Sequence, residues 1–406
     1  MGQFQTTTSL PPLFTLDDLE QSFVWIVELR KEYSSNSDIW LLRRNWHVIK
    51  DNLLIQLNDG SYRFGLLDRY EFDDGILSLW PSQDMIALKL ITQALQLQMG
   101  EHIPKSCYHV KNHGGLKKGV DHTHKALQNH EFVMRSDIKS YYNSIRFDVL
   151  MGIVESTIKH PILLTLLHKA LRRTETRGGL FYEYYEKGLP MGSPLSPLLG
   201  AIALIPLDNA MSQIKGIFYA RFMDDWVVLT KSKTALRKIV KITHKVLNSL
   251  KLELHPNKTY IGKISHGFNF LGYYMDDQKI LPSKETLRRC FERATALYEH
   301  PQGNGKGSRR SKKKTSTGRD TSNYQVNEPA PTDGYFKNIL ENLLELSAQR
   351  PDSFAVLRRY IGRWARWLKL GLSTLSELQL NVEAHLPSIF SCWLPGTKII
   401  ALGSCH

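Results

Sequence analysis

The chain has 406 residues, 42% of them hydrophobic and 10% aromatic, which is ordinary for a folded protein and excludes global disorder. The formal net charge of +14 favours a polyanionic partner, with a basic surface of no function as the alternative. The four cysteines form no CxxC pair, and we find neither a signal-peptide pattern nor an apolar run of about 18 residues, so we expect a reduced cytoplasmic protein without a membrane partner.

The first part of the chain is predicted to be a folded lobe that ends in a helix. Residues 16–99 show mixed patterns, and from Asp84 to Met99 the apolar residues crowd one side, as in a packed helix. The segment from His109 to Lys118 is rich in glycine, which lets a backbone approach a ligand closely, and in lysine, which adds charge. An exposed basic loop is the alternative for this segment.

Residues 132–274 alternate short apolar strands with helix-like stretches, which predicts a sheet with helices packed on it. One of these strands is predicted to end at Asp137. The segment Gly188–Gly200, rich in glycine and proline, leads into a predicted helix over 201–207. Its irregular backbone suits close approach to a base pair or a sugar, although such loops often have no chemical role.

Two strand-like runs, 218–223 and 226–230, are separated only by Asp224 and Asp225, which predicts a β-hairpin with both acids at its tip. Two carboxylates at a tight turn repel each other, so the pair favours magnesium bound through oxygen, with a solvated loop as the alternative. Together with Asp137 they could hold two cations about 3.5 to 4 Å apart, the arrangement that phosphodiester synthesis uses.

The C-terminal part is predicted to begin with a helix over 284–298. Pro301–Asp333 is rich in small polar residues and predicts a linker or mobile loop. It contains a basic strip that could bind RNA phosphates: Lys306, Arg309, Arg310, Lys312, Lys313 and Lys314. In the helical pattern that follows, Arg363 and Arg366 could bind phosphates, while Trp364 and Trp367 pack inward or stack on a base.

The order of these motifs resembles that of reverse transcriptases, in particular the bacterial group II intron, retron and defence-associated kinds. Asp137 falls in the first palm motif of that family, Gly188–Pro197 in the second and Phe222–Asp225 in the third, the aromatic-x-Asp-Asp box. His255–Lys258 and Phe268–Tyr273 match the fourth and fifth motifs.

This resemblance implies an α/β (α+β) fold class and a right-hand polymerase fold with fingers, an RRM-like palm and a helical thumb. The expected parts are the N-terminal region and fingers (1–125), the palm with the catalytic motifs (126–275), the start of the thumb (276–300), a basic flexible insertion (301–333), and the helical thumb with a C-terminal tail (334–406).

The resemblance also implies roles for single residues. Asp137 and Asp224 would be the principal metal ligands, with Asp225 supporting them and Ile138 lending its backbone carbonyl. Lys258 would donate a proton to the leaving pyrophosphate, with an ordinary surface lysine as the alternative.

Further residues would contact the nucleotide and the primer. Tyr142 would block a 2′-hydroxyl and so select deoxynucleotides, with a core tyrosine as the alternative and Tyr141 as its competitor. The other implied nucleotide contacts are Pro190, Met191, Gly192 and Arg69, and the implied primer and template contacts are Ser193, Phe268, Gly272 and Tyr273. Three of these assignments have alternatives or depart from the family: Met191 stands where the family usually has glutamine, Arg63 rivals Arg69, and the aromatic-glycine hairpin could be core.

The implied function is RNA-directed DNA synthesis from dNTPs with two Mg²⁺ ions, Mn²⁺ being a substitute. The expected partners are an RNA template, in particular a structured non-coding RNA, and the DNA product strand, with a homo-oligomer or a partner protein also compatible. Without a Cys/His nuclease appendage, the chain is similar to the stand-alone unknown-group or defence-associated reverse transcriptases, and this resemblance implies a role in antiphage defence. The alternatives are an intron-type maturase that assists splicing or retromobility and a non-catalytic RNA-binding scaffold.

Overall fold

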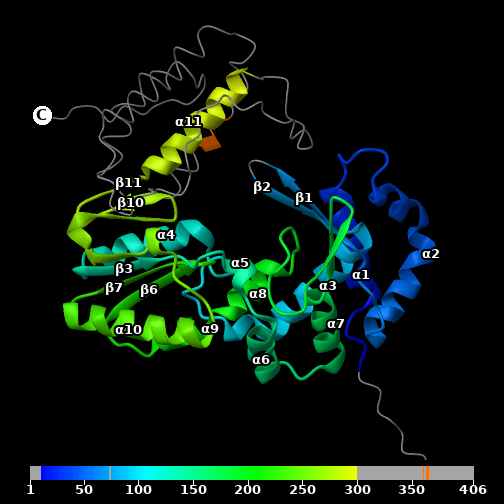
Figure 1. Cartoon of the computed structure of the whole chain (residues 1–406), viewed down its shortest axis with the longest axis horizontal. Helices are drawn as coiled ribbons and strands as arrows, with labels where there is room; N and C mark the ends of the chain where they lie inside the picture. The colour runs from blue at the N-terminus through cyan, green and yellow to red at the C-terminus, as the bar shows by residue number, and fades with distance from the viewer. Residues whose placement is uncertain (1–10, 73–74, 300–359, 361–362, 365–406) are drawn as a thin grey trace, which may run out of the picture. The chain divides into compact units, whose positions relative to one another are not determined.

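The structure, a computed structural model, describes residues 11–72, 75–299, 360 and 363–364 (Figure 1). The principal helices are α1 (Leu16–Leu29), α2 (Asp38–Asp59), α3 (Ser82–Met99), α4 (Gly115–Leu127), α5 (Tyr141–Ser144), α6 (Phe147–Thr157), α7 (Pro161–Leu171), α8 (Ser196–Ala203), α9 (Ile205–Ser212), α10 (Lys233–Ser249) and α11 (Lys284–Glu299). The strands are β1 (Leu67–Phe72), β2 (Gly75–Leu79), β3 (Phe132–Ser136), β4 (Thr174–Arg177), β5 (Leu180–Glu183), β6 (Ile217–Phe222), β7 (Asp225–Thr230), β8 (Tyr260–Lys263), β9 (Phe268–Phe270), β10 (Tyr273–Met275) and β11 (Ile280–Pro282).

The mixed α and β class is confirmed, and most predicted elements are found where the patterns indicated. Helices α3 and α11 match the predicted stretches 84–99 and 284–298, and β3 ends one residue before Asp137. The predicted helix over 201–207 was wrong in its bounds. Helix α8 begins at Ser196 and ends at Ala203, and α9 begins after Leu204. The helix is interrupted there because Pro206, near the start of α9, has no amide hydrogen to continue it.

The glycine- and lysine-rich segment 109–118 is loop only in its first half. Gly114 has a φ of 102°, in the left-handed region, and precedes the first residue of α4. The second half of the segment is therefore the first turn of a helix, which corrects the interpretation of the whole stretch as an exposed loop.

The chain divides into two compact units. Their bounds are Met1–His113, Asp137–Lys215 and Arg237–His255 for the first, and Gly114–Ser136, Gly216–Leu236 and Pro256–His406 for the second. In the part of the chain that the structure describes, no helix is both long enough and apolar enough to cross a membrane.

In the first unit the helices pack around α3, which contacts α1, α2, α7 and α8. Residues on several sides of α3 are buried, among them Ile86, Leu88, Ile91 and Leu95, as expected of a helix in the centre of a core. Thr15 caps the first helix: its hydroxyl accepts the Asp18 amide at 3.1 Å, while the Asp18 carboxylate accepts the Thr15 amide at 3.0 Å.

The first unit also carries a four-stranded sheet in the order β2-β1-β4-β5. Strands β1 and β4 are parallel, with Leu67 opposite Glu175 and Asp68 opposite Thr176, whereas the other pairs are antiparallel. Strand β5 lies at the edge of this sheet, and its Leu180 and Phe181 are exposed.

The second unit is built on a four-stranded antiparallel sheet in the order β6-β7-β3-β8, with α4 packed against β6 (Figure 1). Residues Trp226–Leu229 of β7 are completely buried, which fits a central strand. The register places Ser136, the last residue of β3, opposite Trp226. A smaller sheet of β9, β10 and β11 follows in the chain.

Candidate active site

The acidic turn joins β6 to β7, but its geometry differs from the predicted one. Phe222 pairs with Asp225, so the tip of the hairpin consists of Met223 and Asp224, and Asp225 is the first residue of β7. Met223 has a φ of 58°, in the left-handed region that a side chain rarely adopts. The completely buried Arg221 donates from Nη1 to the Met223 carbonyl oxygen at 2.9 Å and so holds this turn.

Asp225 accepts two hydrogen bonds from Arg135 of β3. Arg135 Nε lies 3.0 Å from Oδ1 and Nη2 lies 3.1 Å from Oδ2, and the two side chains are 15% and 18% exposed. Arg135 Nη1 also donates to the carbonyl oxygen of Lys258 at 2.9 Å. A bidentate pair of this kind fixes the orientation of the carboxylate as well as its charge. This contact favours the supporting role that the resemblance gave Asp225.

Asp137 directly follows β3 and is half-buried. Its carbonyl oxygen accepts the His255 amide at 2.8 Å, the Lys139 amide donates to the Glu253 carbonyl at 3.0 Å, and Ile138 forms an isolated bridge with Leu254. Backbone hydrogen bonds thus join the first-motif segment to the fourth-motif segment. They fix the position of the Asp137 backbone.

Lys258 is exposed at the end of a short 3₁₀ turn, Pro256–Lys258. The next residue, Thr259, shares a hydrogen bond of 2.6 Å between its hydroxyl and that of Ser136. The backbone near Lys258 is therefore tied to β3 by two contacts, while its ammonium group reaches solvent. Its exposure is compatible both with the predicted proton donor and with an ordinary surface lysine.

The two tyrosines of α5 differ in burial. Tyr141 is 5% exposed, and its hydroxyl donates to the Gly200 carbonyl at 2.5 Å, so Tyr141 is the core tyrosine. Tyr142 is half-exposed and stacks on Tyr141, with the ring centres 5.7 Å apart. Of the two rings, Tyr142 is therefore the one that a ligand can reach.

The second-motif segment, Gly188–Pro197, is fixed by backbone hydrogen bonds at its start, by a hydrogen bond of Ser196 and by a close approach to Ser78. The Gly188 amide donates to Ile145 and the Leu189 amide to Tyr142, at 3.0 and 2.8 Å. Ser196 closes the turn by donating from its hydroxyl to the Pro190 carbonyl at 2.5 Å. Gly192 has a φ of 79°, and a Cβ atom there would lie 2.8 Å from the Ser78 carbonyl oxygen.

The predicted nucleotide-contacting residues of this segment differ from one another in solvent exposure. Pro190 is buried, Met191 is half-buried and Gly192 is exposed. Ser193, a predicted template contact, is buried, and its hydroxyl accepts the Leu195 amide at 3.1 Å. Among these residues the backbone around Gly192 is the most accessible part.

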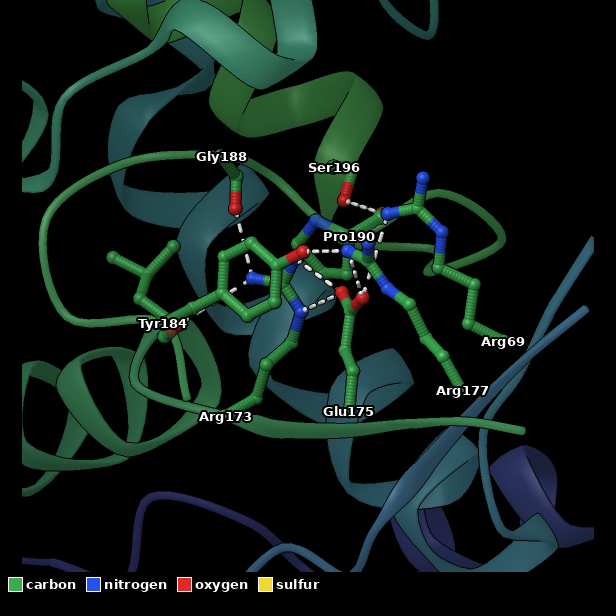
Figure 2. A network of polar contacts seen from close by, with 9 residues as sticks. Arg69, Arg173, Glu175, Arg177, Tyr184, Gly188, Pro190 and Ser196 are labelled. Atoms are coloured by element: carbon green, nitrogen blue, oxygen red, sulfur yellow. Dashed lines mark hydrogen bonds and ion pairs between the residues drawn. The ribbon is translucent and has the colours of Figure 1, made fainter. Parts of the chain in front are cut away.

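Arg69, predicted to contact the triphosphate, lies in a cluster of charged residues (Figure 2). Arg69 Nη1 is 3.5 Å from Oε2 of Glu175, which is also contacted by Arg173 and Arg177. Burial lowers the pKa of the Arg173 guanidinium, and the neighbouring Glu175 opposes that shift. Arg63, the rival of Arg69, is exposed.

The fifth-motif side chains are buried. Phe268 and Tyr273 are 1% and 0% exposed, which favours the core alternative for these two rings. Gly272, with a φ of 86°, accepts the Ser283 amide and the Thr286 hydroxyl at its carbonyl. Lys117 of α4 donates to the Tyr273 hydroxyl at 2.6 Å, and burial lowers the pKa of Lys117 to about 8.

The predicted RNA-binding residues fall mostly outside the described part of the chain. Arg363 is described and is exposed on a helical turn beside the half-buried Trp364. The remaining ones lie outside the described residues: Lys306, Arg309, Arg310, Lys312, Lys313, Lys314 and Arg366.

Comparison with known families identifies the middle of the chain. Residues 78–275 match the family model described as reverse transcriptase (RNA-dependent DNA polymerase). Residues 78–275 are a reverse-transcriptase domain. The domain begins in β2 and includes all five motifs, from Asp137 to Tyr273. Enzymes of this family use divalent metal ions.

Several curated proteins are similar to part of this chain. Protein YkfC of Escherichia coli is 26% identical over 45% of this chain and 59% of its own length. The group II intron-encoded protein LtrA of Lactococcus lactis is 29% identical over 31% of this chain and 22% of its own length. An uncharacterized 91 kDa protein in the cob intron of Schizosaccharomyces pombe is 36% identical over 21% of this chain and 10% of its own length. The chain thus spans less than two thirds of each relative.

A solved telomerase from Candida albicans, in complex with a TWJ fragment of telomeric RNA, also resembles the chain. It has a TM-score of 0.48 and 11% identity, covering 82% of this chain and 63% of that one. The score is too low to establish a common fold.

The acids of the reverse-transcriptase domain suit a hard cation in chemistry, because carboxylate oxygens are the ligands that Mg²⁺ prefers. Within the described ranges, no group of three or more His, Cys, Asp and Glu side chains is arranged to hold a metal ion.

Proposed function

We propose that the chain is an RNA-directed DNA polymerase that extends a primer with dNTPs, using two Mg²⁺ ions held by Asp137 and Asp224. The position of the acids carries this proposal. Asp224 lies at the tip of the β6–β7 hairpin, Trp226 pairs with Ser136, and Asp137 follows Ser136 in the chain. Two acids at the β6–β7 turn and a third directly after β3, all in the segment that matches the reverse-transcriptase family, support the proposal.

When bound at Asp137 and Asp224, divalent cations would supply a lower pKa for the primer 3′-hydroxyl and charge neutralisation for the leaving pyrophosphate. Asp137 and Asp224 supply the oxygen ligands, with the Ile138 carbonyl beside them. Arg135 keeps the Asp225 carboxylate in a fixed orientation through two hydrogen bonds. Lys258, on the exposed turn that Arg135 also contacts, donates the proton that the pyrophosphate takes up.

Other residues of the domain orient the substrates. Tyr142 is the accessible tyrosine of α5, and its ring excludes a 2′-hydroxyl. The backbone at Gly192 is exposed, so a base pair can approach it. Template and product would be an RNA strand and its DNA complement, and we propose a dedicated structured non-coding RNA as the natural template, in a system of antiphage defence.

An intron-type maturase is the second candidate function, because two of the similar proteins carry an intron in their names. A maturase that only folds and splices RNA does not need the acids for splicing. Splicing of a cognate intron by an Asp224→Ala/Asp225→Ala variant would favour this candidate over the polymerase.

The first experiment is incorporation of labelled dNTPs by the purified full-length chain, with any co-purifying RNA and with poly(rA)/oligo(dT), in Mg²⁺ and in Mn²⁺. We expect sequenceable cDNA from the wild type and none from Asp137→Asn. Asp148→Asn is the matched control, since Asp148 is an exposed acid paired with Arg146 and should leave activity unchanged. No incorporation by the wild type on either template would rule out the polymerase.

A further inference from the structure

A deeply buried ion pair of the first unit joins Arg173 and Glu175, outside the motifs that resemble the family. Their side chains are 3% and 2% exposed. Arg173 Nε and Nη2 both donate to Glu175 Oε1, at 2.9 and 2.6 Å (Figure 2). Burial on this scale removes both charges from water, which costs free energy that the pair must offset.

Arg173 also contacts the start of the second-motif segment. Its Nη1 donates to the Gly188 carbonyl at 2.8 Å, on the side of the guanidinium away from Arg69 and Arg177 (Figure 2). The Tyr184 ring lies 4.2 Å from the Arg173 guanidinium carbon, and the Tyr184 amide donates to the Arg173 carbonyl at 3.0 Å. One guanidinium therefore bonds both to a buried carboxylate and to the backbone of Gly188.

The second oxygen of Glu175 connects the pair to the sheet. Arg69 of β1 and Arg177 of β4 approach Oε2 at 3.5 and 3.4 Å, longer than the Arg173 contacts. Leu67 and Glu175 are opposite each other in the parallel β1–β4 pair. Through Arg173, Glu175 thus connects strands β1 and β4 of the sheet to the backbone of Gly188.

Gly188 is adjacent in sequence to Leu189, which contacts Tyr142, the residue proposed to select deoxynucleotides. Its own amide donates to Ile145, and the next amide, of Leu189, donates to the Tyr142 carbonyl at 2.8 Å. Further along, Gly192 lies against the Ser78 carbonyl of β2, in the same sheet as Glu175. A shift of Gly188 would therefore displace Tyr142 relative to the Gly192 turn.

We propose that Arg173 and Glu175 are positioning residues that set the Gly188–Gly192 turn against Tyr142 and thereby control selection of the incoming deoxynucleotide. This inference rests on the proposed polymerase function. Replacing a buried ion pair by apolar residues is often neutral for stability, so stability alone does not account for the pair, whereas its directional bonds fix the turn.

The experiment measures kcat, KM for dNTP, the preference for dNTP over rNTP and the thermal midpoint. It compares the wild type, Glu175→Gln, Arg173→Met and the double variant Arg173→Met/Glu175→Met. We expect KM to rise about tenfold and the preference to fall about tenfold in each variant, with kcat less affected, because misplacing a positioning group costs on the order of 10- to 100-fold. Asp148→Asn, which alters the exposed bidentate pair of Arg146, should leave all four quantities unchanged.

The double variant separates positioning from stability. It removes the buried carboxylate that Arg173→Met leaves without its main partner, and the Arg69 and Arg177 side chains that lose Glu175 are 15% and 28% exposed. Its thermal midpoint should therefore exceed that of Arg173→Met, while its loss of dNTP preference should persist. Recovery of the preference together with the midpoint would overturn the inference, as would a fall in kcat with KM and preference unchanged.

A fourth variant covers the case in which the buried substitutions do not fold. Tyr184→Leu removes the ring that stacks on Arg173 but keeps the ion pair, and we expect a shift of about threefold in the same direction. A preference equal to that of the wild type would overturn the inference. A wild type that incorporates no dNTP would instead overturn the proposed function, and the inference with it.

Discussion

Two arginine–carboxylate pairs differ in what they leave accessible. In the second unit Arg135 contacts both oxygens of Asp225, and both side chains remain partly exposed. In the first unit Arg173 directs two nitrogens to one oxygen of Glu175, and both side chains are almost completely buried. The same chemical pair thus orients an accessible acid in one unit and holds a segment of backbone from within the core in the other.

The largest expected effect is on the rate of dNTP incorporation, and it should differ between substitutions of the neighbouring acids Asp224 and Asp225. Asp224→Asn should lower the rate of dNTP incorporation by about a thousandfold, or about 4 kcal/mol, as expected for loss of a metal ligand. Asp225→Asn should cost about 10- to 100-fold, the usual range for a group that orients a ligand from outside, because Arg135 already occupies both its oxygens. Single-turnover rates on one primer–template compare the two variants, and equal losses would contradict the distinction.

The second effect compares the stability of the two pairs. Arg173→Met should lower the free energy of unfolding by about 3 to 5 kcal/mol, because it leaves the buried Glu175 without its main partner. Arg135→Met should cost only about 1 to 2 kcal/mol, between the values for exposed and buried pairs, since water reaches Asp225. Urea unfolding of both variants measures the difference, and a larger cost for Arg135→Met would reverse our assignment of roles.

The smallest effect concerns Asp84, a buried acid of the first unit. Asp84 accepts the Tyr62 hydroxyl at 2.5 Å and the Gly65 amide at 2.8 Å, and burial raises its pKa to about 6. Because this folded pKa lies above the unfolded value of about 3.9, the stability it contributes is complete below pH 4 and is lost as pH rises to about 6.

Asp84→Asn should remove that dependence, which amounts to at most about 3 kcal/mol for a shift of about two pKa units. Free energies of unfolding between pH 4 and 7 test this prediction, with Asp148→Asn as the control. A slope that is unchanged in Asp84→Asn would show that another group titrates in this range.

The sequence was informative where the signal is local. The apolar runs around Asp224 and Asp225 predicted the hairpin, although only the register showed that Asp225 belongs to β7. Pro206 is a local signal, since a proline within 201–207 cannot continue a helix that began before it. The burial of Tyr141 and the accessibility of Tyr142 could not be read from two adjacent identical residues.

The arginine contacts depend on long-range pairing. Arg135 and Asp225 are 90 residues apart, and Arg69 and Glu175 are 106 residues apart, so their contacts follow from strand register rather than from local pattern. One visible signal was a charged residue that directly follows an apolar run in a strand, as Arg135 follows Phe132–Met134. Such a residue needs a partner when the strand is central.

Strand β5 has a consequence for handling the protein. It ends its sheet with Leu180 and Phe181 exposed, and an apolar sheet edge of this kind favours pairing with the same edge of another molecule. The net charge of +14 opposes such self-association, because like-charged molecules repel each other until salt screens them. High salt, which strips nucleic acid from a basic protein, is therefore also the condition in which purified molecules will most readily aggregate.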